Sequence, residues 1–517
     1  MAGETAVNKT EDEPGISGEC DLDRGYVSPV RTFRDLSLCS IGSVLLRSRY
    51  LEILVVLTLA GFVLRFWHLG YNSLWLDEAI TQFFSSQTLY GIWLIVAGGE
   101  FNPPLFYWIE HFMLMLGNSE TILRIVPAVA GVLAIPVFYL VGKEFYDRNT
   151  GIIAAACAAF SPFLISYAQE ARAYTLMLLF LALAVLFFFR GIKSASLADW
   201  ALFGVFAALA FWSHFYALVM VAALVLFVLV TELPRVRADP ARLKMPGAGL
   251  CVFLVLCLPL IAVTISLAML RIQTPSSWGA EGTDLVVMTF YRLLFYYLSF
   301  KFMVLLALLG AGLVQAFILD RNKGFWLVFV SAVTFAVSWA LSFRIPMDPR
   351  YLIFLSLVFY PCIAMSYRAF LSVWNHRAVV YLLIIALFLI SVPALTDYYS
   401  GYSKADWRGF AAGLAGRTVP GDTVVVVPQY IDRPLAYYYS VEQNRVTLRG
   451  ATTAQDLEEI RASVRTRDHT VYVVLMNEFF SSADPGPGSA SAWLLKNARP
   501  AGTDVTARIA LFTLPQS

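Results

Sequence analysis

Long apolar runs separated by short polar or basic breaks dominate the chain from residue 51 to residue 395. About 20 apolar residues suffice to cross the hydrocarbon core of a bilayer as a helix, and a helix satisfies its own backbone groups there. The pattern therefore predicts a mostly α-helical, polytopic transmembrane bundle. The candidate segments are 51–67, 102–118, 120–142, 151–168, 174–190, 198–213, 215–231, 249–270, 287–300, 302–319, 325–342, 350–368 and 377–395.

Two of these segments are doubtful crossings, so we expect about 11–13 membrane helices. Segment 102–118 opens on Asn102 and two prolines and contains Glu110, while 287–300 is short and contains Arg292. If both dip or lie in the interface, most basic residues of the middle stretch are cytoplasmic, as the positive-inside rule favours. We favour this interpretation, which also puts Glu170 on the same side as loop 68–101; if both segments cross, the assignment inverts there. The basic residues in question are Lys143, Arg148, Arg190, Lys193, Arg235, Arg237, Arg242 and Lys244.

The N-terminal end reads as a disordered cytoplasmic tail over residues 1–45. It carries an acidic run at 11–13 and scattered Gly, Pro and Ser without apolar periodicity. Arg47 and Arg49 then precede the first apolar run, which makes that run an inside-to-outside crossing. Loop 68–101 is therefore expected on the outer face, at the start of a membrane domain spanning 46–398.

After Leu395 the composition changes to alternating strand and helix patterns, which predict a small extracytoplasmic α/β domain over 399–517. Strands are expected at 423–427, 470–475 and 504–514, and helices at 404–417, 432–440, 455–465 and 491–498. Asp406 to Arg408 and Tyr437 to Tyr439 place charges and aromatic rings near helix starts. They could contact an extended acceptor, but for the tyrosines we favour packing against the membrane surface.

Composition supports a membrane protein, because 59% of the residues are hydrophobic and 14% are charged. The net charge of +2, without a basic patch interleaved with aromatics, excludes nucleic acid as the expected partner. No ligand-like CxxC pair occurs among the six cysteines, so neither a structural disulfide nor a cysteine-bound metal is implied.

Adjacent carboxylates stand out at Asp77 and Glu78, among aromatic residues just after the first crossing. An ionisable group in a membrane bundle costs roughly 2.5 to 3.5 kcal/mol and needs a partner or a watery cavity. One carboxylate could be a general base for transfer to a hydroxyl group. Alternatively, Asp77 merely caps an interfacial helix. Neighbours on one backbone are unsuited to face one substrate together, so we assign one to chemistry and one to structure.

A second group of polar residues, Gln169, Glu170 and Arg172, interrupts two apolar helices. Glu170 could orient an acceptor or bind a metal, and Arg172 could hold a phosphate. The alternative is a mutual ion pair that closes a helical hairpin. Glu120 and Arg124, four residues apart on one helix face, could likewise be only an i,i+4 pair.

A phosphate-linked donor would need cations to stabilise the leaving group. Arg350, followed by Tyr351 at the start of a predicted helix, is the first choice. His214, at a predicted outer turn among aromatic residues, could be a ligand or proton donor, or a hydrogen-bonded packing residue. The remaining arginines, which could simply reach lipid headgroups, are Arg271, Arg292 and Arg344.

An ordered set of motifs carries a family resemblance. The motifs are LWLDEA at 74–79, NPPLFYW at 102–108, LRIVPA at 123–128 with Gly131 and Pro136, the segment 161–174, and PRYL at 349–352. Together they resemble the GT-C glycosyltransferases, and within them the bacterial protein O-mannosyltransferase, aminoarabinose transferase and rhizobial lipopolysaccharide-core glycosyltransferase group.

The resemblance implies an inverting transfer from a polyprenyl-phosphate sugar on the periplasmic side of a bacterial inner membrane, with Asp77 activating the acceptor. It also suggests that Glu170 lies near the site and that Arg124 matches an important arginine of the mannosyltransferase branch. Two departures matter. The C-terminal domain is not a β-trefoil, so protein O-mannosylation is not implied, and a second acidic metal motif is missing from the sequence.

The resulting hypothesis is a membrane glycosyltransferase that transfers a hexose or pentose from a polyprenyl-phosphate donor to a lipid, glycan or protein hydroxyl. No cofactor is certain, and a divalent metal stays open. The alternative is a transporter or flippase of lipid-linked sugars. Expected catalytic residues are Asp77, Glu78 and Glu170, and expected substrate-binding residues are Asn102, Arg124, Arg172, His214, Arg350 and Tyr351.

Overall fold

The structure is a computed structural model that describes residues 49–236, 239–273, 279–294, 300–374, 376, 378–464, 469–476 and 489–515. The chain divides into two compact units, Met1–Leu51 and Glu52–Ser517, and all contacts below lie in the second. The expected tail at 1–45 and Arg237 lie outside the described residues, as do the side chains of Arg235 and Arg271.

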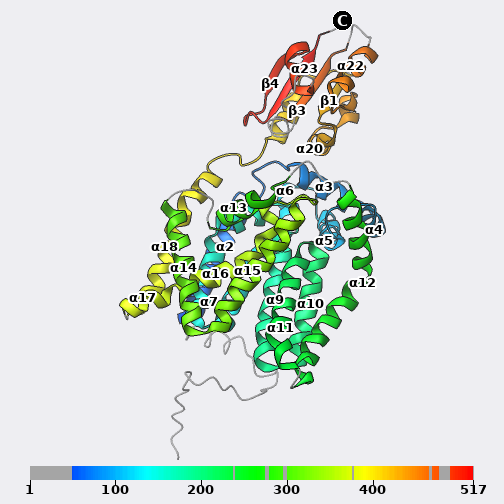
Figure 1. Cartoon of the computed structure of the whole chain (residues 1–517). Coiled ribbons are helices and arrows are strands. Elements are labelled where there is room, and N and C mark those ends of the chain that lie inside the picture. The colour runs from blue at the N-terminus through cyan, green and yellow to red at the C-terminus, as the bar shows by residue number, and fades with distance from the viewer. Residues whose placement is uncertain are drawn as a thin grey trace, which may run out of the picture. The chain divides into compact units, whose positions relative to one another are not determined.

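Helices dominate the described chain up to residue 399 (Figure 1). Helices α9, α10 and α12 lie side by side, as do α14, α15 and α16. The bounds are α2 Arg49–Phe66, α3 Leu76–Ser85, α4 Leu89–Ala97, α5 Pro104–Leu114, α6 Glu120–Phe145, α7 Arg148–Phe160, α8 Pro162–Ala168, α9 Tyr174–Ser194, α10 Leu197–Ser213, α11 Ala217–Val236, η1 Pro240–Leu243, α12 Lys244–Gln273, α13 Gly282–Leu293, α14 Phe300–Leu319, α15 Arg321–Ser342, η2 Pro349–Leu355, α16 Ser356–Met365, α17 Tyr367–Val373 and α18 Ala378–Tyr399.

Eight helices among the described residues are long and apolar enough to cross a membrane, or nine if the bent pair α7–α8 is one span. Of the other expected crossings, α10 has 17 residues and α2 contains three charged residues. The doubtful segments form α5 and α13, of 11 and 12 residues. At about 1.5 Å per residue these two helices fall well short of the roughly 30 Å hydrocarbon core, which favours the interpretation that neither crosses.

The break between α7 and α8 is stabilised by a buried arginine. Pro162 has no N–H, so the carbonyl of Ala158 loses its helical donor, and the two helices meet at 57°. Arg65 of α2 replaces it, since its Nη2 donates to Ala158 O at 2.8 Å and its Nη1 to Ala159 O at 3.2 Å. A side-chain cation therefore satisfies the backbone where the span bends.

Gln169, which follows α8, in turn donates hydrogen bonds to the end of α2. Its Nε2 donates to the carbonyls of Arg65 at 3.0 Å and Trp67 at 2.7 Å, which have no helical partner at the C-terminus of α2. The turn at 169–173 is therefore joined to the C-terminal end of α2 by side-chain to backbone hydrogen bonds.

A five-stranded sheet follows the membrane helices, in the order β2-β1-β3-β5-β4. Strand β1 pairs in parallel with β2 and β3, whereas β5 is antiparallel to β3 and β4. The bounds are α19 Trp407–Ala415, β1 Thr423–Val427, η3 Gln429–Ile431, α20 Asp432–Tyr438, α21 Val441–Asn444, β2 Thr447–Gly450, α22 Ala454–Ser463, β3 Val471–Met476, α23 Ala490–Asn497, β4 Arg499–Thr503 and β5 Ile509–Leu514.

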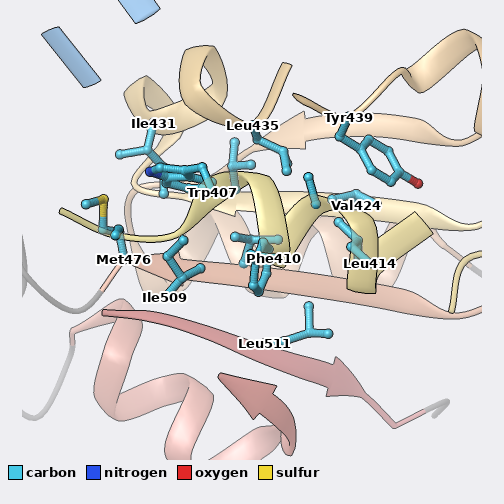
Figure 2. Close-up of a cluster of buried hydrophobic side chains, with 14 of the residues drawn as sticks. Trp407, Phe410, Leu414, Val424, Ile431, Leu435, Tyr439, Met476, Ile509 and Leu511 are labelled. Carbon is cyan, nitrogen blue, oxygen red and sulfur yellow. The ribbon is translucent and has the colours of Figure 1, made fainter. Parts of the chain in front are cut away.

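Both faces of this sheet are covered, because successive side chains of a strand point to opposite faces. Val424 and Val426 of β1 join a cluster with Trp407 and Leu435 from α19 and α20 (Figure 2). Val425 points to the opposite face of the sheet, where it packs against α22 and α23. This arrangement explains why β1 is a continuous run of valines.

Two edge strands were not expected from the sequence. Strand β2 has four residues, and β4 contains both Pro500 and Gly502, which weaken a strand pattern and are tolerated at edges. The expected strand at 504–514 is in fact the second arm of a β4–β5 hairpin.

Replacing Leu435 tests whether this core holds the domain together. Leu435 is fully buried, so Leu435→Ala should lower stability by about 2–5 kcal/mol through lost contacts and a cavity. Leu495, which is 74% exposed, provides the matched control, and Leu495→Ala should change stability by under about 0.5 kcal/mol. Amide hydrogen exchange of β1 in the full chain measures both, and equal protection in the two variants would contradict the prediction.

Candidate functional site

Helix α3 presents the two adjacent carboxylates in its first turn. Trp75 is the N-cap residue, and Glu78 reaches back to the Trp75 backbone N–H at 3.4 Å, so Glu78 and not Asp77 makes the capping contact. Glu78 is fully buried, whereas the side chain of Asp77 is 22% exposed. The two carboxylates therefore have different surroundings.

Glu78 forms a bidentate ion pair with Arg124 of α6. Its Oε1 and Oε2 accept from Arg124 Nε and Nη2, each at 2.8 Å. Oε1 also accepts from Ala171 N at 2.8 Å, and Lys404 Nζ lies 3.2 Å from Oε2. Burial by itself would raise the pKa of Glu78, but Arg124 and Lys404 lower it to about 2.

Arg124 is equally committed to the protein. Besides Glu78, it donates from Nη1 to the carbonyls of Leu69 and Asn72 and from Nη2 to that of Ser73, at 2.8–3.1 Å. These bonds use all five N–H donors of a guanidinium group. Arg124 therefore fixes the loop before α3, and this geometry argues against the expected contacts of Glu78 and Arg124 with a substrate.

Asp77 faces a different pair of cations. Its Oδ2 lies 3.3 Å from Arg350 Nη1 and 4.0 Å from Arg172 Nη2. Arg172 also donates from Nη1 to the Asp77 carbonyl at 3.3 Å. Arg172 therefore pairs with Asp77, and not with Glu170 as one of the two interpretations of the sequence predicted. Three segments distant in sequence thus bring one carboxylate and two guanidinium groups together.

Aromatic rings surround the Arg350 guanidinium, which sits in the first turn of η2. Its Cζ lies 5.2 Å from the Trp75 ring centroid, 5.8 Å from that of Tyr174 and 5.6 Å from that of Tyr351. Asp348 accepts from the Arg350 backbone N–H at 3.0 Å. The expected residue Tyr351 therefore lines this site as a ring that packs against the cation.

His214 lies next to the same rings. Its imidazole is 5.4 Å from the Tyr174 ring and 5.3 Å from the Tyr351 ring, and the residue is 1% exposed. Burial, followed by the charges of Arg172 and Arg350, lowers the pKa of His214 to about 3. Nδ1 accepts from Tyr216 N at 3.3 Å, which puts the proton on Nε2, and Nε2 has no hydrogen-bond partner within the described chain.

Glu170 lies close to Glu78 but points to a different partner. Its Oε1 is 3.2 Å from Lys404 Nζ, which also contacts Glu78. Burial raises the pKa of Glu170 above its ordinary value, and Lys404 offsets part of that rise. Lys404 was not expected from the sequence, since it belongs to the segment that leads into the α/β domain, where nothing local distinguishes it from a surface lysine.

Asn102 lies just before α5 and is 6% exposed. Its Nδ2 donates to Glu100 Oε1 at 2.9 Å, and the Tyr107 hydroxyl donates to the same oxygen at 2.9 Å. The amide therefore fixes the Glu100 carboxylate, a second residue that the sequence analysis did not single out.

The α/β domain contacts the loop beside this site. Arg408 Nη2 lies 2.5 Å from Glu120 Oε1, so the i,i+4 pair of Glu120 and Arg124 is not formed. The Tyr438 hydroxyl donates to Glu120 at 2.7 Å and accepts from Leu74 N at 2.8 Å, while Tyr437 donates to the Asn118 carbonyl at 2.7 Å. The interpretation that these tyrosines pack on the membrane surface was wrong, because they bind the chain itself.

The other two expected arginines have different surroundings. Arg292 donates to the Tyr167 hydroxyl at 3.1 Å, and Arg344 is exposed. Within the described ranges, no group of three or more His, Cys, Asp or Glu side chains could hold a metal ion.

The sequence matches a family model described as dolichyl-phosphate-mannose-protein mannosyltransferase over residues 102–263. The match begins after Asp77 and Glu78 and includes Arg124, Glu170, Arg172 and His214. No curated protein sequence matches the chain.

Solved structures share the fold at low sequence identity. ArnT from Cupriavidus metallidurans bound to undecaprenyl phosphate matches with a TM-score of 0.60 and 13% identity, over 89% of this chain and 97% of that one. The oligosaccharyltransferase of Archaeoglobus fulgidus in complex with Zn and sulfate matches with a TM-score of 0.52 and 13% identity. This match covers 87% of this chain and 72% of that one. The partial family match and the shared fold together identify a multi-pass membrane protein with the GT-C glycosyltransferase fold.

Proposed function

We propose that this protein transfers a sugar from a polyprenyl-phosphate donor to a hydroxyl group of an acceptor, with Asp77 as the general base. The observation that carries this proposal is the convergence of Asp77, Arg172 and Arg350. A partly exposed carboxylate beside two guanidinium groups supplies both a proton acceptor and binding groups for a phosphate. The reaction is expected on the periplasmic face of a bacterial inner membrane.

The donor class rests on chemistry and on a similar protein. Arginine binds phosphate through paired N–H donors, and the rings around Arg350 keep it partly shielded from water. The similar ArnT structure contains undecaprenyl phosphate. At 13% identity this likeness establishes the fold alone, so the carrier lipid is part of the proposal.

The proposed reaction is a single displacement. The acceptor oxygen forms a bond to the anomeric carbon, its proton passes to Asp77, and the bond from the anomeric carbon to the phosphate oxygen breaks with inversion. Arg350 and Arg172 take up the charge that develops on the leaving phosphate. Because both arginines contact Asp77 in the present structure, the phosphate would compete with Asp77 for them and leave its carboxylate available to the acceptor.

His214 is proposed as a neutral hydrogen-bond donor in this site. Its low pKa keeps the imidazole uncharged at ordinary pH, so it cannot act as a cation or an acid there. The Nε2–H, which has no partner in the described chain, would donate to the donor phosphate.

Glu78 and Arg124 are proposed to support the site without touching the substrate. Their ion pair holds α3 against α6 and the turn at 169–173 through Ala171. Asp77 is thereby held near Arg172 and Arg350.

The Asp77→Asn variant should fold and insert normally but lose at least about 100-fold in transfer rate, because an amide cannot accept the proton. Intact-lipid mass spectrometry of a deletion strain complemented with wild type or variant measures the product and reveals the mass of the transferred sugar. Asp284→Asn, on the exposed surface of α13, is the control and should behave as wild type.

Retained transfer by Asp77→Asn would remove Asp77 as the base. Movement of a lipid-linked sugar across vesicles containing the purified protein, without cleavage of the bond to phosphate, would instead favour a flippase.

The Glu78→Gln variant should lose stability by about 3–5 kcal/mol, because Arg124 is left buried without its counter-ion. The folded-state pKa of about 2 lies below the ordinary 4.5, so ionised Glu78 stabilises the fold above pH 4.5. That contribution is lost as pH falls toward 2. The melting temperatures of wild type and variant should therefore differ most near neutral pH and converge between pH 4.5 and 2. A difference in melting temperature that stays constant over this pH range would disprove the stabilising role of ionised Glu78.

Replacing His214 tests its role as a neutral donor. The His214→Leu variant should lose roughly 10- to 100-fold in transfer rate, the range expected for a hydrogen bond to a charged group, and His214→Gln should recover part of it. Because the pKa of His214 is about 3, the rate profiles of wild type and His214→Gln should have the same shape between pH 5.5 and 8. An inflection near pH 6.5 that disappears with His214 would refute a neutral imidazole.

A further inference from the structure

A cavity of about 390 Å³ is lined in part by Glu170 and Lys404. It is formed by α8, the end of α18 and two segments of the C-terminal region. Asp77 is not part of its wall. The lining residues are Pro162, Ser166, Tyr167, Glu170, Ala394, Asp397, Tyr398, Ser403, Lys404 and Arg508.

The cavity wall combines two acidic side chains, Glu170 and Asp397, with two basic ones, Lys404 and Arg508. It therefore shows no excess of one sign that would select an anion or a cation. Carboxylates accept hydrogen bonds and ammonium or guanidinium groups donate them, while two tyrosine rings add flat apolar surface. This mixture fits a neutral ligand rich in hydroxyl groups.

Two atoms near this cavity lack the hydrogen bonds that buried polar atoms normally form. Within the described chain, Glu170 Oε2 and Ser403 Oγ are buried without a partner, and both residues line the cavity. Glu170 as a whole is only 9% exposed. Leaving a buried acceptor unpaired carries a desolvation cost that a new hydrogen bond would remove. Rotation of either side chain into the cavity would bring its unpaired atom to a hydroxyl-bearing ligand.

One layer of side chains separates the cavity from the reacting carboxylate. Lys404 lines the cavity and contacts Glu78, the neighbour of Asp77, at 3.2 Å. Lys404 Nζ also lies 5.4 Å from the Trp75 ring centroid, while Arg350 Cζ lies 5.2 Å from the same centroid. The cavity is therefore adjacent to the residues that surround Asp77.

We propose that this cavity binds a carbohydrate residue of the acceptor, with Glu170 accepting a hydrogen bond from a sugar hydroxyl and Lys404 and Ser403 donating to sugar oxygens. Its place in the reaction rests on the proposed glycosyl transfer. Carbohydrate binding itself does not, and it can be measured separately.

Saturation-transfer NMR provides the test, with the full chain in nanodiscs free of glycoside detergent. The probes are the methyl glycosides of glucose, mannose, galactose and N-acetylglucosamine. Ala394→Phe should fill the cavity and reduce the signal at least tenfold, while Glu170→Gln and Ser403→Ala should each weaken it. Val392→Phe places the same ring on the exposed face of α18 and should match wild type. Asp77→Asn should bind the glycosides normally.

Absence of signal for every glycoside with wild type, or a signal that survives Ala394→Phe, would overturn the proposal. Loss of the signal on adding undecaprenyl phosphate would also overturn it, because the cavity would then belong to the carrier lipid. If the signal depends on Ala394 but wild type transfers no sugar in cells, the carbohydrate site stands and the proposed transferase function fails.

Discussion

The buried ion pair between Glu78 and Arg124 is the contact on which the geometry of the site depends. A carboxylate and a guanidinium group removed from water are tolerated only when their hydrogen bonds are complete. Here Arg124 uses all its donors, and the Glu78 oxygens accept from the side chains of two other residues and from the backbone N–H of Ala171. The pair therefore ties α3, α6 and the turn at 169–173 into one arrangement, and Asp77, the preceding residue of α3, is held with it.

A second set of contacts fixes the same turn from the membrane side. Pro162 breaks a span and frees a carbonyl, and Arg65 of α2 supplies the missing donor. Gln169 in turn supplies donors to the last carbonyls of α2. Backbone groups that lose their helical partners inside a bilayer must find others, so the break at Pro162 also determines that α2 packs beside it.

The C-terminal domain contributes to the site as well as to its surroundings. Arg408 and Tyr438 bind Glu120 beside the loop before α3. Lys404, in the segment leading into that domain, joins Glu78 to Glu170. Trp75 lies within reach of both Lys404 and Arg350. The polar groups thus fall into two sets, one around Asp77 and the other around Glu170, and the proposed donor and acceptor subsites follow this division.

The sequence by itself determined the helical membrane bundle, the α/β domain and the prominence of Asp77 and Arg350, because hydropathy, strand alternation and the cost of a charge in a membrane are local properties. It could not assign Glu78 to structure and Asp77 to the exposed position, since neighbouring residues share one local pattern. Nor could it find Lys404, or show that Arg124 pairs with Glu78 rather than Glu120. These choices were decided by tertiary structure, because ion pairs join residues far apart in the chain and depend on which side chains packing brings within hydrogen-bonding distance.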